Sequence, residues 1–287
     1  MIRRALLCLC FALALPAQSA AIRLVDDVGR VVDLPRTPRR IVSLAPHLTE
    51  LLFAAGAGAQ LAGVDSASDY PPAARTLPRV GDATRVNFER VLALKPDLVV
   101  VWVDGNRAVD IHRLETLGVP VLHTRATRLD DVARLLRLLG QASGHVEMAQ
   151  AAAAAYTARI DALRAARAGR TPVKVFYELW DRPLITVGGT HWISDALALC
   201  GARNVFADVA ALAPVVSREA VLARAPDVIA SGSDAPDVRW AWKRFARLPA
   251  VQKQAFVRID ADRLHRLTPR LADGVAALCA ALEPYPR

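Results

Sequence analysis

Two segments of the chain repeat the same short pattern, and this repeat limits the possible fold more than any other feature. Residues 87–100 and 217–229 each read as a short helix, a Pro-Asp pair and a β-branched apolar run. Proline cannot continue a helix, and the residue before it is pushed toward extended geometry. The apolar run is typical of a parallel strand buried on both faces. The repeat predicts two similar α/β lobes, although this common connection could also recur by chance.

The rest of the chain alternates between strand-like and helix-like patterns, and one long helix separates its halves. Residues 146–168 are rich in alanine and contain no glycine or proline, which favours a single helix. Alternating strands and helices predict parallel sheets with covering helices. We therefore expect an α/β fold of two Rossmann-like lobes with parallel sheets, joined by one long rigid helix, with a ligand cleft between the lobes. The alternative is that this stretch is an ordinary surface helix of a single domain.

The first twenty residues have the pattern of a cleavable signal peptide. Arg3 and Arg4 precede an apolar run over residues 5–15, and small residues follow at 16–21. The run is too short and wrongly flanked for a membrane-spanning helix. The expected organisation is a signal peptide at 1–20, an N-terminal lobe at 21–140, a connecting helix at 141–170 and a C-terminal lobe at 171–287.

The chain is basic, with a formal net charge of +9. Basicity raises the question of a nucleic-acid partner. The basic residues are scattered, mostly as arginines on expected helices, and no Lys/Arg run is interleaved with aromatic residues. We therefore expect no nucleic-acid partner.

Two cysteines, Cys200 and Cys279, remain after removal of the signal peptide. An even pair in an exported protein suggests a disulfide. The alternative is two buried thiols that act as small apolar side chains. Neither cysteine has a histidine or another cysteine at ligand spacing, so we expect no zinc site.

Three histidines, His47, His191 and His265, fall in loops at element ends that should line the cleft. Neutral imidazole is a natural ligand for a transition metal, so these residues also allow a metal-centred ligand. The sequence contains no nucleophile elbow, no phosphate-binding loop and no His-Glu-x-x-His pair. We expect a binding protein without catalytic residues, and an exported enzyme with a cleft site is the alternative from another class.

Aromatic side chains occur in the same loops. Trp102, Trp180 and Trp192 all lie at expected element ends. A tryptophan there can stack on a flat macrocycle and hydrogen-bond through its indole N–H, or it can pack on the core of its own lobe. Arg266 could pair with the polar rim of a ligand or with Asp262.

Glu89 and Glu219 hold equivalent positions in the two copies of the repeat, near the start of a helix. Acidic residues are favoured there by the helix dipole alone. Two matched, exposed acids on a two-lobed protein could also meet two matched basic pockets on a symmetric partner.

Several motifs carry a resemblance to a known family. They are residues 43–46, 49–51, 68–72, 87–102, 216–226, Cys200-Gly201 and Pro269-Arg270. With these motifs the chain resembles the periplasmic substrate-binding proteins with a helical backbone between two lobes, and most closely the cobalamin-binding branch. The likeness covers nearly the whole chain from about Ile41.

The resemblance implies a monomeric periplasmic protein that binds cobalamin or another corrinoid in the cleft and delivers it to the membrane subunits of an ABC importer. It implies a Cys200–Cys279 disulfide and docking of Glu89 and Glu219 on the importer. It also implies that Trp102, Asp262 and Arg266 line the ligand site, while the bound corrinoid is cargo and no catalytic cofactor is expected.

This sequence departs from the cobalamin pattern at several cage positions. Alanine replaces an aromatic residue at positions 67, 83 and 213, and Leu179 and Ile185 replace phenylalanine. Trp180, Trp192, His47 and His191 could rebuild the cage. The alternative ligands within the class are haem and ferric siderophores, for which His47, Tyr177 or His191 could supply an iron ligand.

Overall fold

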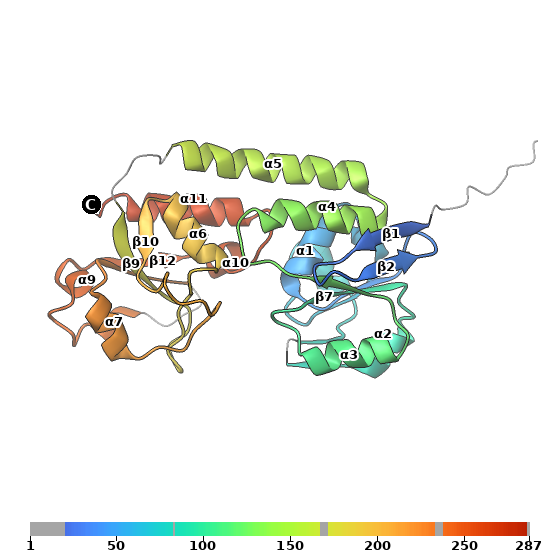
Figure 1. Ribbon diagram of the computed structural model, residues 1–287, viewed down its shortest axis with the longest axis horizontal. Coiled ribbons are helices and arrows are strands. Elements are labelled where there is room, and N and C mark those ends of the chain that lie inside the picture. The colour runs from blue at the N-terminus through green and yellow to red at the C-terminus, as the bar shows by residue number, and fades with distance from the viewer. Residues whose placement is uncertain (1–20, 83, 167–171, 233–237, 286–287) are drawn as a thin grey trace, which may run out of the picture.

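Two four-stranded parallel sheets organise the chain. A computed structural model describes residues 21–82, 84–166, 172–232 and 238–285, so the expected signal peptide lies outside the described residues. The first sheet contains, in spatial order, β4 (Leu61–Val64), β3 (Ile41–Ser43), β7 (Leu98–Trp102) and β8 (Val121–Thr124). The second contains β10 (Ala202–Asn204), β9 (Val173–Glu178), β11 (Val228–Gly232) and β12 (Phe256–Ile259). Both sheets have the strand order second, first, third, fourth, which confirms the expected α/β fold of two similar lobes (Figure 1).

The repeated pattern builds the same unit in both lobes. It forms α2 (Phe88–Ala93) before β7 and α7 (Arg218–Arg224) before β11. Asn87 and Ser217 cap these helices by accepting a hydrogen bond from the backbone N–H three residues on. Lys95 and Ala225, each followed by proline, turn the chain with φ values of 47° and 44°. The sequence repeat therefore corresponds to a repeated structural unit, with one copy in each lobe.

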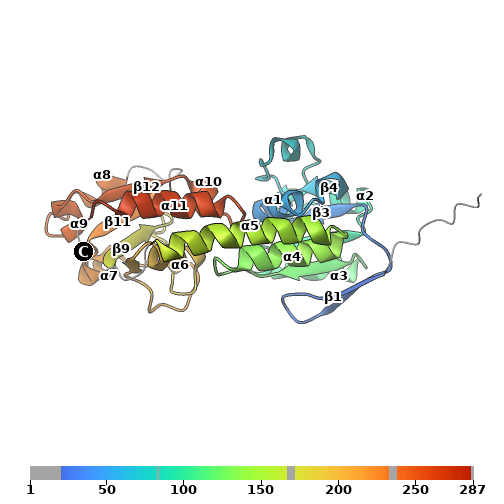
Figure 2. The same cartoon turned by 90° about the horizontal axis from the view of Figure 1, so that it is seen from above.

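Helices cover both faces of each sheet. On the N-terminal sheet, α1 (Pro46–Ala54) and α4 (Asp131–Ser143) lie on one face, while α2 and α3 (Ala108–Thr116) lie on the other (Figure 1). On the C-terminal sheet, α6 (Trp192–Leu199) and α11 (Leu271–Leu282) lie opposite α7, α8 (Val238–Trp242) and α9 (Pro249–Gln252) (Figures 1 and 2). The remaining short elements are η1 (Gly58–Gln60), η2 (Pro72–Thr76), β5 (Gly81–Asp82), β6 (Arg85–Val86) and α10 (Ala261–Leu264). Among the described residues, no helix is both long and apolar enough to cross a membrane.

The long helix α5 (Val146–Ala165) runs along both lobes (Figures 1 and 2). Ala149, Ala153, Tyr156 and Ile160 are its buried residues. A Cβ atom on Gly140 of α4 would lie only 2.2 Å from that of Ala149, so the two helices pack closely. One continuous buried apolar cluster passes beneath α5 from one lobe into the other, which ties the lobes together on this side.

Two further links secure the ends of the chain. Cys200, at the end of α6, forms a disulfide with Cys279 of α11, which confirms the expected bridge. Near the N-terminus, β1 (Ile22–Val25) and β2 (Val31–Leu34) pair as an antiparallel hairpin. Its turn is held by His123, whose ring nitrogens lie 2.7 Å from Asp26 Oδ2 and 3.0 Å from Glu115 Oε1.

Replacing His123 tests this link. His123→Ala leaves the fully buried Asp26 carboxylate without its ring partner, so we expect a loss of about 3 kcal/mol in unfolding free energy. Urea unfolding measures the loss. His112→Ala removes a histidine whose side chain is 81% exposed and serves as the matched control. Equal losses in the two variants would contradict the structural role of His123.

Candidate functional site

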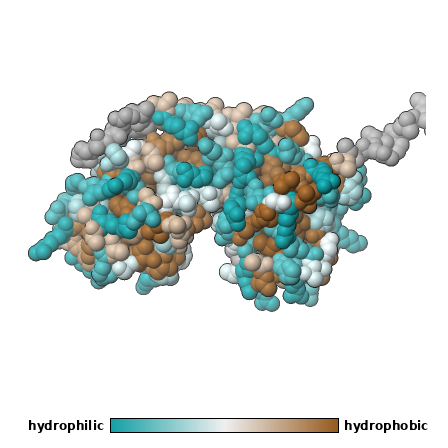
Figure 3. Space-filling view, in the orientation of Figure 1, coloured by the Kyte–Doolittle hydropathy of each residue, from teal (hydrophilic) through white to brown (hydrophobic). Residues whose placement is uncertain are grey.

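The space-filling view shows a deep notch between the two lobes (Figure 3). Helix α5 runs along the opposite side of the molecule (Figure 1). In parallel α/β sheets, ligands bind beyond the carboxyl ends of the strands. Trp102 ends β7, and the loop that carries Trp180 follows β9. These residues come from different lobes, so the notch is the candidate ligand cleft.

Charged side chains connect the lobes across this cleft. Glu50 of α1 is 4% exposed and accepts hydrogen bonds from both Arg270 and Arg266. The Arg270 Nη2–Glu50 Oε1 distance is 2.6 Å, and the Arg266 Nη1–Glu50 Oε1 distance is 3.1 Å. Arg266 also donates to Asp69 at 2.6 Å. A buried carboxylate shared by two arginines from the other lobe holds the lobes in a defined relation.

The same network brings together two residues expected at the ligand site. Asp262 and Arg266 form an ion pair of 2.9 Å, with Asp262 more exposed than Arg266. Burial opposes the charge on Arg266, but its hydrogen bonds to Asp69 and Glu50 raise its pKa above the ordinary value. Arg266 is therefore a permanent cation at the cleft.

The N-terminal lobe brings His47 and Trp102 together. Their rings meet edge to face, with centroids 5.1 Å apart. Burial, with a smaller effect of the Arg266 charge, lowers the pKa of His47 to about 3. His47 is therefore a neutral imidazole at physiological pH. Within the described part of the chain, its Nε2 atom and the Trp102 Nε1 atom are buried without a hydrogen-bond partner.

The loop after β7 fixes the position of Trp102. Asn106 Oδ1 accepts a hydrogen bond from the Trp102 backbone N–H, and Asn106 Nδ2 donates to Leu44 O. A Cβ atom on Gly105 would lie 1.9 Å from the indole ring, so glycine allows this close contact. Trp102 therefore packs against its own loop and stays partly exposed.

The C-terminal lobe carries Trp180 on the loop after β9. This side chain is 58% exposed, and its indole N–H donates to Arg182 O at 3.1 Å. Its backbone pairs with Ile185, which in turn pairs with Val215. Val215 is 66% exposed, so the two side chains place apolar surface in solvent at the same short ladder.

Two other expected residues of this lobe, His191 and Trp192, are buried, and His265 is partly buried. Trp192 is buried and donates to Leu264 O at 2.9 Å, while the His191 ring stacks on it at 3.7 Å. His191 Nδ1 accepts the Ile193 backbone N–H and caps α6, and burial followed by the His265 charge lowers the His191 pKa to about 3. His265 Nε2 lies 2.8 Å from the hydroxyl of the buried Tyr177. These side chains therefore make contacts within the C-terminal lobe.

Two of the alanines at the expected cage positions lie at the surface. Ala67 and Ala213 are exposed, and Ala83 lies outside the described residues. No cluster of three or more His, Cys, Asp or Glu side chains that could hold a metal occurs within the described ranges.

Sequence reasoning assigned no role to Glu50, Asp69, Tyr70 or Arg270. The Arg270 guanidinium lies 3.9 Å from the centroid of the Tyr70 ring, which adds a cation–π contact to the network. The sequence does contain one signal for this network. Glu50 lies within the apolar run of helix 46–54, and a charged side chain buried there requires an oppositely charged partner.

The matched acids occupy equivalent places at the surface. Glu89 and Glu219 are each the second residue of α2 and α7, and both are exposed. The two helices lie in different lobes on the side away from α5 (Figure 1). Hydrogen bonds from its own backbone N–H and from Ser217 lower the pKa of Glu219, so this group is a carboxylate at neutral pH.

The buried histidines predict a pH dependence of stability. The pKa values of His47 and His191 fall from 6.5 in the unfolded chain to about 3 in the folded protein. Between these values the unfolded chain binds more protons, so stability decreases as pH falls, by about 1.4 kcal/mol per pH unit for each histidine. Urea unfolding between about pH 6 and pH 5 measures this slope.

His47→Asn should remove about half of the slope that the two histidines produce. His112→Asn, at an exposed position, should leave it unchanged. An unchanged slope in His47→Asn would show that His47 is not buried in its neutral form.

Comparison with known proteins agrees with this architecture. The family model for "Periplasmic binding protein" matches residues 41–262. A vitamin B12-binding protein of Vibrio cholerae is 38% identical over 250 residues, covering 87% of this chain and 91% of the relative.

Solved structures give the same result. The crystal structure of the V. cholerae periplasmic vitamin B12-binding protein BtuF superposes with a TM-score of 0.79 at 38% identity, covering 86% of this chain and 97% of BtuF. The periplasmic heme-binding protein RhuT from Roseiflexus has a TM-score of 0.74 at 28% identity, covering 85% of this chain and 97% of RhuT. The resemblance expected from the sequence motifs is confirmed, and the chain belongs to the periplasmic binding protein family.

Proposed function

We propose that the protein captures a corrinoid, most simply cobalamin, in the interlobe cleft and delivers it to the membrane subunits of an ABC importer. The observation that carries the proposal is the 38% identity with vitamin B12-binding relatives over nearly the whole mature chain. The expected signal peptide at 1–20 would export the protein to the periplasm, where it acts as a monomer and performs no covalent chemistry.

The two walls of the cleft suit a flat macrocycle with a polar rim. Trp180 and Val215 offer apolar surface on one wall, and Trp102 offers an aromatic ring on the other. Asp262 and Arg266 lie at the lobe junction, where they can pair with polar groups of the ligand. In this proposal the exposed Trp180 takes over part of the cage that positions 67 and 213 lack. The buried His191 and Trp192 and the partly buried His265 support the wall from behind.

Haem is the second candidate ligand, because heme-binding relatives share the fold at 28% identity. Of the three possible iron ligands, Tyr177 is hydrogen-bonded to His265, and His191 Nδ1 accepts a backbone N–H. His47 keeps a neutral imidazole whose Nε2 has no partner among the described residues. A haem-binding function would therefore depend on His47.

Docking would use the matched acids. Glu89 and Glu219 are exposed carboxylates in different lobes and lie on helices at the open side of the cleft. A membrane partner with two basic pockets would engage both lobes at once. The cleft would then face the translocation path while the protein is docked.

Trp180→Ala tests the C-terminal wall. The side chain is mostly exposed, so its removal should weaken cyanocobalamin binding by about tenfold with little loss of stability. Calorimetric titration gives the affinity, and thermal unfolding gives the stability. The control Trp240→Ala removes another exposed tryptophan, which contacts Lys243, and should leave affinity unchanged. Equal affinities for the wild type and Trp180→Ala would remove Trp180 from the site.

The double substitution Glu89→Ala with Glu219→Ala tests docking. Uptake of radiolabelled cyanocobalamin by cells that depend on this protein should be lost, while the affinity of the purified variant stays at the wild-type value. Lys and Arg side chains on the partner would lose both of their carboxylates. Undiminished uptake would eliminate these two acids as the docking contacts.

A further inference from the structure

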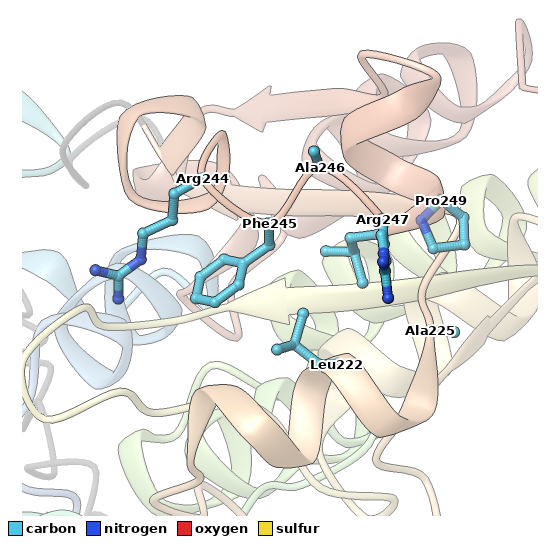
Figure 4. Close-up of a pocket in the computed structure, with 8 residues that line it drawn as sticks. Leu222, Ala225, Arg244, Phe245, Ala246, Arg247 and Pro249 are labelled. Carbon is cyan, nitrogen blue, oxygen red and sulfur yellow. The ribbon is translucent and has the colours of Figure 1, made fainter.

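The C-terminal lobe carries a second concave surface, away from the cleft. A pocket of about 510 Å³ lies between α7 and the loop that leads into α9 (Figure 4). Leu222 reaches into it from α7, and Phe245 reaches toward Leu222 from the facing loop. Pro249 closes one end, and Arg244 and Arg247 provide the charged groups of its lining. An apolar socket beside two arginines is suited to an apolar side chain with an acidic neighbour.

This pocket is continuous with the surface around Glu219. Leu222 follows Glu219 by three residues on α7, so the two side chains lie on the same side of the helix. Arg244 lines the pocket, and its positive charge acts on the Glu219 carboxylate. A partner that engages Glu219 therefore also reaches the rim of the pocket.

The surroundings of the matched acid in the other lobe differ in chemistry. Leu92, the counterpart of Leu222 in the repeat, is 40% exposed. The cavity that borders Glu89 has a volume of about 920 Å³ and is lined by the charged side chains of Arg85, Arg107 and Arg113, among others. The two acids are alike, but the cavity beside Glu219 has a mainly apolar lining, whereas the cavity beside Glu89 is lined mainly by charged and polar side chains.

We propose that the pocket formed by Leu222, Phe245 and Pro249 receives a bulky apolar side chain from the importer subunit that docks on Glu219. Acidic groups next to that side chain would pair with Arg244 and Arg247. This inference rests on the proposed docking function and adds that the two lobes recognise their subunits differently, one through an apolar socket and the other mainly through charge. A small polar ligand is a poorer fit, since no buried polar side chain of the pocket lacks a partner.

Two variants test the socket from opposite directions. Ala246→Trp places a large ring at an exposed position of the pocket lining. Leu222→Ala removes an apolar side chain that lines the pocket. The matched controls are Ala155→Trp on the exposed side of α5 and Leu92→Ala at the equivalent position of the other lobe. Labelled mature protein is titrated onto membranes from cells that make the importer, and cyanocobalamin affinity is measured separately in solution.

Each socket variant should dock on the order of tenfold more weakly than the wild type, with both controls and all solution affinities unchanged. Wild-type docking by both socket variants, or equal losses in Leu222→Ala and Leu92→Ala, would overturn the inference. A wild-type dimer that Ala246→Trp converts to a monomer would overturn it too, because the pocket would then bind a second copy. If the wild type binds no cyanocobalamin, the ligand proposal fails, whereas the docking comparison still decides the role of the socket.

Discussion

The Glu50 carboxylate is the point on which the arrangement of the two lobes depends. It is almost completely buried, and both of its arginine partners come from the other lobe. A buried charge of this kind is tolerated only while its hydrogen bonds are intact, so separation of the lobes would expose an unpaired group. The apolar cluster beneath α5 and the Arg159–Asp273 pair between α5 and α11 act in the same direction. Together these contacts favour a small closure of the cleft over a wide opening.

Arg266 links this scaffold to the candidate ligand site. It pairs with Glu50 and Asp69 across the lobe junction and with Asp262 within its own lobe. Burial is the main cause of the lowered pKa of His47, and the Arg266 charge adds to it. A ligand that recruits Arg266 or Asp262 would act on the contacts that set the relation between the lobes. Ligand binding and lobe closure would then be coupled through one guanidinium group.

Much of the fold was predictable from the sequence because its determinants are local. The Pro-Asp pairs, the caps at Asn87 and Ser217 and the β-branched runs after them define the same unit in each lobe. The even pair of cysteines suggested the Cys200–Cys279 bridge, and the family resemblance implied it. The long helix α5 ends at Ala165, three residues before the end expected at residue 168. Residues 167–171 lie outside the described part of the chain.

The site was less predictable because it depends on contacts between distant residues. Glu50 and Arg270 are 220 residues apart, and no local pattern links them. Trp192 and Trp180 have similar positions at element ends, yet one packs in the core and the other lies in solvent. Tertiary contacts make this difference: the Trp180 indole donates to Arg182 O in its own loop, whereas the Trp192 indole donates to Leu264 O of α10.

The most direct test of the proposed function is a titration of the purified mature protein with cyanocobalamin, followed by calorimetry or tryptophan quenching, with haemin in parallel. We expect tight binding of one cyanocobalamin per protein, because the cleft combines exposed aromatic surface with a charged junction. Absence of cyanocobalamin binding together with a shift of the haem Soret band would contradict the corrinoid assignment. It would place the protein with the haem binders of the family, with His47 as the first residue to mutate.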